Sequence, residues 1–296
     1  MENVAFSGGQ SRVEVAPSIR FAILYSVFGT NLQHGLWWDF RAAATDEPPR
    51  TWSNAMECRN LKKRFLFRMT YYRNLERYLA DSAIYAKHNP HFQGGYRISF
   101  DEIVARRGTS AFQTPCGSTV NHFVPFYFSP ITKMAFTIDA GNVELRAPDG
   151  QSLGKASMND VAFLVVEPQR LFNSGRQCWF TDIACNSGIQ PAYEDDPAKL
   201  EEHIDWALFD DSPYMAMIPE IGYAGVCRYQ FDRDDPPAHQ QRSKKRMAEF
   251  LVRDCLKMEE VSCIVLKSAE HEGEVRSWLD AAGLPIRLLI KPACYV

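Results

Sequence analysis

Residues 122–138 read HFVPFYFSPITKMAFTI, a largely apolar and aromatic run within a chain of 296 residues. The part from His122 to Phe128 has the length and the aromatic content of a strand that is buried on both faces. Its Phe126, Tyr127 and Phe128 are expected in the core rather than as a stacking platform for bases. After a Ser-Pro break, Lys133 to Ile138 predicts another strand, and Val161 to Glu167 predicts a third.

Helical patterns lie on both sides of these strands. Apolar residues at i,i+4 spacing predict a helix over Asn74 to Asp81. Asp196 and Pro197 form a strong helix start, since Asp caps a first turn and Pro fits its first position. That helix is expected to run to about Phe209, and a further helix is expected over Gln240 to Asp254.

Towards the C-terminus, strand and helix patterns alternate. Gln177 to Thr181 predicts a short aromatic strand, and Val261 to Lys267 predicts another. A helix over Glu270 to Ala282, closed by Gly283, precedes a strand over Ile286 to Lys291. Because the strands come in several short groups with helices between them, the pattern favours an α+β fold over a regular doubly wound sheet.

The composition is that of an ordinary globular chain, with 46% apolar and 23% charged residues. No apolar run reaches the roughly 18–20 residues that a membrane helix needs, and Glu2 stands where a secretory signal would carry basic residues. The eight cysteines are scattered without a Cys-x-x-Cys pair or zinc-like spacing, which argues against a disulfide framework and a metal site. We therefore expect a soluble cytoplasmic protein with no metal and no membrane contact.

The chain divides unevenly along its length. Residues 1–55 combine Gly8-Gly9, Trp37-Trp38 and a breaker cluster from Asp46 to Pro49, without a sustained helical or strand period. They are either an N-terminal cover for the domain or the product of a start codon placed upstream of Met56. A single domain is expected over residues 56–296.

Charge is concentrated in three segments, although the whole chain has a formal net charge of −3. Residues 59–107 hold eleven Lys or Arg and four acids, a net of +7, and residues 242–257 have a net of +4. Residues 194–235 hold twelve acids and three basic residues, a net of −9. A basic segment with interleaved aromatic residues suits a polyanion or a single-stranded nucleic acid. On composition alone, a solvated face beside a few core aromatic residues is the favoured interpretation.

Glu249 is the candidate catalytic acid. It lies in MAEFLV (residues 247–252), after four cations within seven positions. A carboxylate among apolar residues is costly to bury unless a charged or hydrogen-bonding group meets it. The alternative is a helix-surface glutamate at i+4 from Lys245.

Six blocks along the chain resemble the DarT family. Residues 122–136 resemble its Val-Pro-Phe-Tyr-Phe strand followed by Ser-Pro-x-x-x-Met. Arg68-Met69-Thr70-x-x-x-Asn74-Leu75 resembles its His-x-Thr-x-x-x-Asn-Leu, and residues 103–107 resemble its Ile-x-x-Arg-Arg. The other blocks are FTDxA (180–184) with IDW (204–206), AEFLV (248–252) and KPxCY (291–295). Each block alone is weak, but together they cover about residues 64–296 and are specific.

The resemblance implies an α+β ADP-ribosyltransferase fold, a split pair of small β-sheets with flanking helices and NAD in the cleft. It implies transfer of ADP-ribose from NAD, as co-substrate, to a base of single-stranded DNA. A DarG-type macrodomain antitoxin would remove the modification. Cleavage of the nicotinamide–ribose bond builds positive charge on the anomeric carbon, as in glycoside hydrolysis, and a fixed carboxylate stabilises that charge without a metal.

On this resemblance Glu249 is the catalytic carboxylate, and Arg106 and Arg107 face the pyrophosphate and the incoming base. The residues expected to contact NAD are Arg68, Met69, Thr70, Arg77 and Arg107, and those expected along the DNA are Lys244, Lys245 and Arg246. Asn74 is expected to fix the local turn. Because arginine is a poor general base at neutral pH, we expect positioning and charge stabilisation from Arg106 or Arg107.

Two features depart from the family pattern. Arg68 stands where many members have His, as in the Arg-type ADP-ribosyltransferases, which leaves the orientation of NAD open. The spacing between Arg107 and Glu249 is long and predicts an insertion between residues 186 and 240, either a solvated loop-helix or a contact for DNA or the antitoxin. The target base, thymidine or guanosine, depends on the shape of the pocket. Two alternatives stay open, namely modification of RNA or protein, and a catalytically silent member that binds DNA or the antitoxin.

Overall fold

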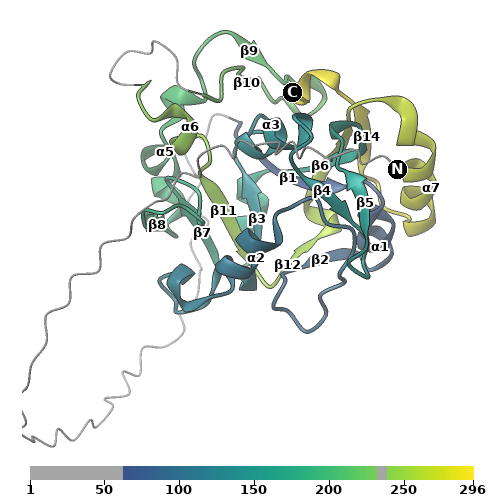
Figure 1. Cartoon of the computed structure of the whole chain (residues 1–296). Helices are drawn as coiled ribbons and strands as arrows, with labels where there is room; N and C mark the ends of the chain where they lie inside the picture. Colours follow the sequence, from purple (N-terminus) through teal and green to yellow (C-terminus); the bar gives the residue numbers. More distant parts are fainter. Residues whose placement is uncertain (1–62, 232–238) are drawn as a thin grey trace, which may run out of the picture. The chain divides into compact units, whose positions relative to one another are not determined.

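A computed structural model of the chain describes residues 63–231 and 239–296 (Figure 1). The expectations for residues 1–55 lie outside the described residues. The main sheet has eight strands in the spatial order β14-β13-β6-β1-β3-β11-β7-β8, and only β13 and β14 are parallel neighbours. These strands are β1 Leu66–Tyr71, β3 Phe123–Tyr127, β6 Val161–Val166, β7 Cys178–Thr181, β8 Tyr193–Glu194, β11 Glu249–Arg253, β13 Val261–Leu266 and β14 Arg287–Ile290.

Small sheets and helices surround the main sheet, so the expected α+β class is confirmed. The small sheets pair β2 Ala83–Tyr85 with β12 Cys255–Lys257, β4 Glu144–Arg146 with β5 Ser152–Lys155, and β9 Tyr214–Met215 with β10 Val226–Cys227. The α-helices are α1 Asn74–Ala80, α2 Asp101–Arg107, α3 Lys133–Asp139, α4 Pro168–Phe172, α5 Leu200–His203, α6 Arg242–Lys245 and α7 Glu272–Ala282. No helix in the two described ranges has the length and apolar content of a membrane span.

The main sheet consists of two halves that are joined at one point. One half contains β14, β13, β6 and β1, the other contains β3, β11, β7 and β8, and their joint is a single register pair, Phe67 with Tyr127. Pro125 of β3 has no N–H to donate to a neighbouring strand, and its carbonyl accepts a hydrogen bond from the Arg68 side chain at 3.1 Å. The structure therefore has one narrowly joined sheet where the family resemblance implied a pair of sheets.

Most of the predicted elements are confirmed. Every residue of β6 is buried, and so are Phe123, Val124 and Phe126 of β3. The strands expected over 177–181, 261–267 and 286–291 correspond to β7, β13 and β14, and the helices expected over 74–81 and 270–282 correspond to α1 and α7. Gly283 closes α7 in the left-handed conformation, with φ of +63°.

The expectation of a strand over Lys133 to Ile138 is wrong, because this segment forms helix α3. The helix begins after Thr132, whose hydroxyl accepts a hydrogen bond from the backbone N–H of Ala135 at 3.2 Å. The buried residues of α3 are Ala135 and Ile138, an i,i+3 spacing that belongs to one helix face. A short apolar run fits either element, and here the Thr132 cap favours the helix.

The expectation of a helix over Gln240 to Asp254 is also wrong. A single helical turn, α6, is followed directly by strand β11, which lies between β3 and β7. The three residues after Glu249 are all buried, because β11 is an inner strand of the sheet. Glu249 is therefore the first residue of a central strand and not a residue on a helix surface.

The helix expected from Asp196 to about Phe209 is interrupted. Asp196 caps it as expected, since its carboxylate accepts a hydrogen bond from the N–H of Ala198 at 3.0 Å. A 3-10 turn at Pro197–Lys199 then leads into α5, and a second 3-10 turn follows at Trp206–Leu208. Trp206 folds back onto α5, where its indole N–H donates to the Leu200 carbonyl at 3.3 Å.

Ion pairs connect the acidic segment to both basic segments. The pairs are Arg64 with Asp210 (2.8 Å) and Glu201 (3.2 Å), Arg242 with Asp211 (2.7 Å), and Lys245 with Asp205 (2.7 Å). The Arg64 guanidinium also stacks on the Trp206 ring, 3.7 Å from its centroid. Residues 201–211 of the expected insertion are therefore packed into the domain, and their acids pair with cations of both basic segments.

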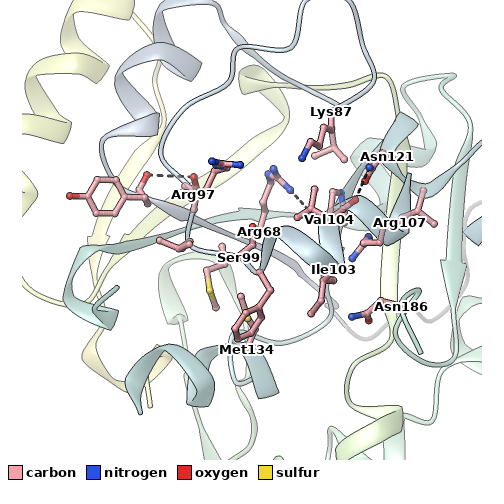
Figure 2. A pocket seen from close by; sticks show the side chains of 18 of the residues that line it. Arg68, Lys87, Arg97, Ser99, Ile103, Val104, Arg107, Asn121, Met134 and Asn186 are labelled. Atoms are coloured by element: carbon pink, nitrogen blue, oxygen red, sulfur yellow. Dashed lines mark hydrogen bonds between the residues drawn. The ribbon is translucent and has the colours of Figure 1, made fainter. Parts of the chain in front are cut away.

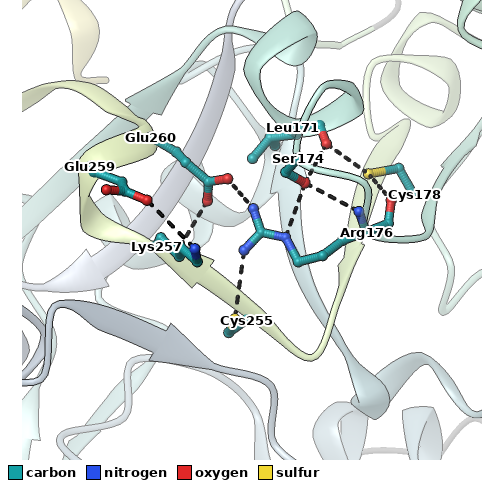
Figure 3. A network of polar contacts seen from close by, with 8 residues as sticks. All are labelled: Leu171, Ser174, Arg176, Cys178, Cys255, Lys257, Glu259 and Glu260. Carbon is teal, nitrogen blue, oxygen red and sulfur yellow. Dashed lines mark hydrogen bonds and ion pairs between the residues drawn. The ribbon is translucent and has the colours of Figure 1, made fainter. Parts of the chain in front are cut away.

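A polar network fixes the end of β11 that leads into β12 (Figure 3). Arg176, in the turn between α4 and β7, pairs with Glu260 and donates to the Ser174 hydroxyl at 3.1 Å. Its Nη1 also lies 3.6 Å from the Cys255 sulfur. Glu260 in turn accepts a hydrogen bond from the backbone N–H of Lys257 at 2.8 Å. These contacts lie at the end of the paired strands β7 and β11 that is opposite to Glu249.

Candidate active site

A pocket of about 830 Å³ lies where β1 and β3 separate (Figure 2). Both strands contribute lining residues, as do α2, α6, the loop at residues 85–100 and the turn at residues 184–187. Its lining cations are Arg68, Lys87, Arg97, Arg107, Lys133 and Lys244, and its lining acid is Asp149. This excess of positive charge suits a ligand that carries phosphate groups.

Glu249 and Arg107 form a buried ion pair beside the pocket. The carboxylate is 1% exposed and the guanidinium 11% exposed, and Arg107 Nη2 lies 2.6 Å from Oε2 while Nη1 lies 3.3 Å from Oε1. Oε1 also accepts a hydrogen bond from the backbone N–H of Cys185 at 2.9 Å. Burial alone would lower the pKa of Arg107, but the charge of Glu249 holds that pKa above its ordinary value. Arg107 is therefore a permanent cation.

Arg68 projects from β1 into the same pocket. Its Nη1 donates to the Pro125 carbonyl, whereas its Nε is buried and has no hydrogen-bond partner in the described structure. Burial lowers the pKa of Arg68, and the positive charge of Arg107 adds to that effect, while Tyr78 opposes it. No described carboxylate forms an ion pair with Arg68, so a bound anion would find an unneutralised guanidinium there.

Asn74 fixes the loop that borders the pocket, as the sequence predicts. Its Nδ2 donates to the Tyr96 carbonyl at 2.9 Å and to the Thr70 hydroxyl at 3.2 Å, and its Oδ1 accepts from the Tyr96 N–H at 2.8 Å. Gly95 has φ of +120°, and a Cβ at this position would lie 2.5 Å from Asn74 Oδ1. Only glycine fits there without displacing Asn74. Met69 and Thr70 line the pocket beside this anchor.

Two of the expected arginines lie outside the pocket lining. Arg106 is exposed, and its guanidinium lies over the Phe112 ring at 5.3 Å from the centroid. Arg77 is exposed on α1, where its Nε lies 3.9 Å from a carboxylate oxygen of Asp81. Of the adjacent pair Arg106 and Arg107, only Arg107 is thus brought together with Glu249 and the pocket.

The three expected DNA contacts on and after α6 lie in different surroundings. Lys244 lines the pocket, whereas Lys245 pairs with Asp205. Arg246 is wholly buried. Its guanidinium donates to the backbone carbonyls of Leu208, Cys227, Tyr229 and Ile131 and to the Ser129 hydroxyl. We keep only Lys244 as a candidate DNA contact, because Arg246 does not reach the surface.

Sequence reasoning missed several polar residues of the pocket. Lys87, Asn121 and Asn186 surround Arg107 in Figure 2. Tyr127, which was expected in the core, is half-buried and lines the pocket, and it is the register partner of Glu249 across β3 and β11. Period-2 alternation was the available signal, because it places Tyr127 on the opposite face from the buried Phe126.

The fold and the site together define an α+β protein with a buried carboxylate–arginine pair beside a cationic pocket, at the split of its main sheet. The chain belongs to the DarT family, because a sequence model described as ssDNA thymidine ADP-ribosyltransferase, DarT, matches residues 67–296. It is therefore an NAD-dependent ADP-ribosyltransferase of single-stranded DNA, and the relationship predicted from the sequence blocks is confirmed.

Solved structures of DarT proteins share the fold. Thermus sp. 2.9 DarT in complex with ADP-ribosylated ssDNA has a TM-score of 0.62 and 21% identity, over 79% of this chain and 97% of that one. Its complex with NAD+ has a TM-score of 0.56 and 19% identity, over 79% and 98%. Thermosipho africanus DarTG in complex with ADP-ribose has a TM-score of 0.52 and 15% identity, over 78% and 51%. A comparison with curated protein sequences finds no match.

Proposed function

We propose that the pocket binds NAD+, that Glu249 and Arg107 direct transfer of ADP-ribose to thymine in single-stranded DNA, and that a DarG-type macrodomain antitoxin counters the modification. The family description and the two Thermus complexes support the substrates, and the Thermosipho DarTG structure supports the antitoxin. The observation that carries the proposal is the buried Glu249 carboxylate, which Arg107 and the Cys185 N–H hold beside a cationic pocket.

Arg68 is the residue that we assign to the pyrophosphate of NAD+. It is the lining arginine whose guanidinium is half-buried, retains an unused Nε and has no described carboxylate partner. A guanidinium binds phosphate oxygens through parallel N–H donors, so one anion would satisfy the groups that the protein leaves open. Met69 and Thr70 line the pocket next to it, where they would contact the ribose parts of the dinucleotide.

Glu249 is placed to stabilise the reacting ribose. When the bond between nicotinamide and ribose breaks, its electron pair leaves with neutral nicotinamide and positive charge develops on the anomeric carbon. Oε1 of Glu249 already accepts two hydrogen bonds, from the Cys185 N–H and from Arg107, whereas Oε2 accepts one from Arg107. Oε2 therefore keeps an acceptor position for a ribose hydroxyl, and the negative charge of Glu249 stabilises the developing cation.

Arg107 would act on the DNA base. The N–H of thymine in DNA is at N3, and its proton passes to water as this nitrogen approaches the anomeric carbon. Until the N–C bond forms, the negative charge left by the proton spreads over N3 and the two neighbouring carbonyl oxygens, which a planar guanidinium contacts well. Because Arg107 stays protonated, it stabilises this charge and does not remove the proton. Glu249 is not among the lining residues, so Arg107 would turn from Glu249 towards the base and open the way for the ribose hydroxyl to reach Oε2.

The first test uses the full chain with labelled NAD+. One single-stranded DNA carries a single thymine, and its control has cytosine at that position; an RNA of the same sequence and a protein mixture complete the set. Label is expected on the thymine-containing DNA alone. Label on RNA or protein in place of DNA would sink the proposal.

The site is tested with Glu249→Gln, which keeps the shape of the side chain and removes its charge. Loss of a preorganised electrostatic contact typically lowers kcat by about a hundredfold to a thousandfold. Binding of NAD+, measured by calorimetry, should change by less than about threefold, because the phosphate contacts remain. Glu274→Gln is the matched control, since Glu274 is an exposed residue of α7. Full activity in Glu249→Gln would overturn the assignment.

A further inference from the structure

The turn that follows β7 is built around the hydroxyl of Thr181, a residue with no exposed surface. The backbone of Thr181 pairs with Tyr193 of β8, while its Oγ1 accepts a hydrogen bond from the Glu249 N–H at 3.1 Å. The ladder between β7 and β11 ends just before this point, since its last register pair is Phe180 with Phe250. The Thr181 side chain therefore takes the place of a backbone partner for Glu249.

The same hydroxyl also shapes the turn that holds the carboxylate. Its hydrogen is donated to the Ile183 carbonyl at 2.7 Å, the nearer of two acceptors, since the Glu249 carbonyl lies at 3.3 Å. A hydroxyl has one hydrogen and two acceptor positions, so it makes this bond and accepts the Glu249 N–H at the same time. Two residues after Ile183, the backbone N–H of Cys185 donates to Glu249 Oε1 at 2.9 Å. One buried oxygen atom thus connects the main chain of Glu249 to the amide that orients its side chain.

The rest of this loop is closed by contacts that do not involve Thr181. The Asp182 carboxylate accepts a hydrogen bond from the Ala192 N–H at 2.8 Å, and the Ser187 N–H donates to the Ala184 carbonyl at 3.0 Å. Loss of the Thr181 hydroxyl would therefore leave the loop closed while releasing the segment that carries the Cys185 amide. The effect would fall on Glu249, because that amide and the Glu249 N–H are the groups that the hydroxyl ties together.

We propose that Thr181 is a positioning residue for Glu249, which fixes both the backbone and the carboxylate orientation of the catalytic acid through its single hydroxyl. This inference rests on the proposed catalytic role of Glu249. Misplacement of a catalytic group by about 1 Å can lower the rate about a hundredfold. Thr181 is wholly buried and its hydroxyl is bonded within the protein, so its effect should appear in kcat and not in the binding of either substrate.

The test compares Thr181→Val with Thr181→Ser. Valine has the shape of threonine without the hydroxyl, so it breaks both bonds, whereas serine keeps the hydroxyl and loses a methyl group. Thr181→Val is expected to lower kcat about tenfold to a hundredfold, with KM for NAD+ changed by less than about threefold. Thr181→Ser is expected to keep kcat within about threefold of the wild type. Thr181→Ala is the second variant lacking the hydroxyl, for use if valine prevents folding, and it should show the same loss of kcat.

Thr114→Val is the matched control. Thr114 is also buried, at 3% exposed, and its hydroxyl closes a turn by donating to the Ser118 carbonyl at 3.0 Å, but it has no contact with Glu249. This variant should melt at a lower temperature than the wild type and keep its kcat. A kcat for Thr181→Val within twofold of the wild type, or a Thr181→Ser enzyme as slow as Thr181→Val, overturns the inference. Wild-type transfer measured in the same assay separates that result from a failure of the proposed function.

Discussion

Arginines of the two basic segments lie in four different environments. Arg107 is paired with Glu249, Arg68 lines the pocket without a described carboxylate partner, and Arg106 is exposed over an aromatic ring. Arg246 is enclosed by backbone carbonyls, and burial lowers its pKa to about 10, which still leaves it protonated at neutral pH. The hydrogen-bond acceptors around each arginine therefore decide whether it is available to a substrate or stabilises the fold. Its position in a basic segment of the sequence does not decide this.

Cys116 is expected to be a fast-reacting thiol. Partial burial alone would raise the pKa of Cys116, but hydrogen bonds from Thr114 and Ser118 and the charge of Arg253 lower it below the ordinary value. By contrast, burial raises the pKa to about 12 in Cys178, Cys185, Cys263 and Cys294. Because the thiolate is the reactive form, a short iodoacetamide pulse near neutral pH should label Cys116 at least about tenfold faster than each of these four.

Peptide mapping by mass spectrometry measures this difference site by site. As pH rises, labelling of Cys116 should level off earlier than that of an ordinary thiol, since its lowered pKa is passed first. The four buried thiols should gain reactivity only on unfolding. Faster labelling of any of them in the native protein would contradict the expectation.

At the level of elements, helix α2 decides where Arg107 lies. Arg107 is the last residue of α2, and Asn121 Nδ2 donates to the carbonyl of Val104 in the same helix at 3.0 Å. Gly108 follows directly, and a Cβ there would lie 2.8 Å from Asn121 Nδ2 and 3.2 Å from the His88 ring. The end of α2 is therefore packed against the Asn121 side chain, which cannot move without breaking its hydrogen bond to the helix.

Gly108→Ala is expected both to slow the enzyme and to lower its stability. The added methyl group has to displace Asn121 from Val104, and overpacking of this kind costs about 1–3 kcal/mol of unfolding free energy. The resulting shift of Arg107 should lower kcat about tenfold. Gly273→Ala is the control, because Gly273 lies in α7 with open space around it, so alanine should stabilise the helix by about 0.5 kcal/mol and leave activity unchanged. Equal kcat values for the two variants would argue against α2 as the element that positions Arg107.

The same elements show what the sequence can and cannot predict. The unbroken apolar content of β3 and β6 makes them recognisable, whereas α3 and β11 are short apolar runs whose period is ambiguous. The need of Glu249 for a charged partner follows from its apolar neighbours, but the identity of that partner does not. Arg107 is 142 residues away in the chain, and only the fold, which places the last residue of α2 beside the first residue of β11, brings the two together. The Cys185 amide is a backbone group and leaves no signature in the sequence.

At the scale of the molecule, ion pairing decides which cations are available to bind DNA, and the distribution of charge along the sequence does not. The net of +4 in residues 242–257 suggests a stripe that follows DNA, yet Arg242 and Lys245 are paired with the acidic segment and Arg246 is buried. Four cations without a described ion pair, Arg68, Lys87, Lys133 and Lys244, line the pocket. The near-neutral total charge therefore coexists with a locally cationic site.

Lys244 and Lys245 provide a direct test of this distinction, because they are neighbours on one helical turn. Each phosphate contact to a single strand contributes about 0.7 to the slope of log K against log salt concentration. Lys244→Ala should therefore weaken binding of single-stranded DNA and reduce that slope by about 0.7, as measured by fluorescence anisotropy over a salt series. Lys245→Ala should leave the slope unchanged, since its ammonium is held 2.7 Å from Asp205. An equal reduction of the slope in Lys245→Ala would mean that the ion pair with Asp205 does not keep Lys245 from the DNA. In that case the acidic segment would not determine which cations bind the substrate.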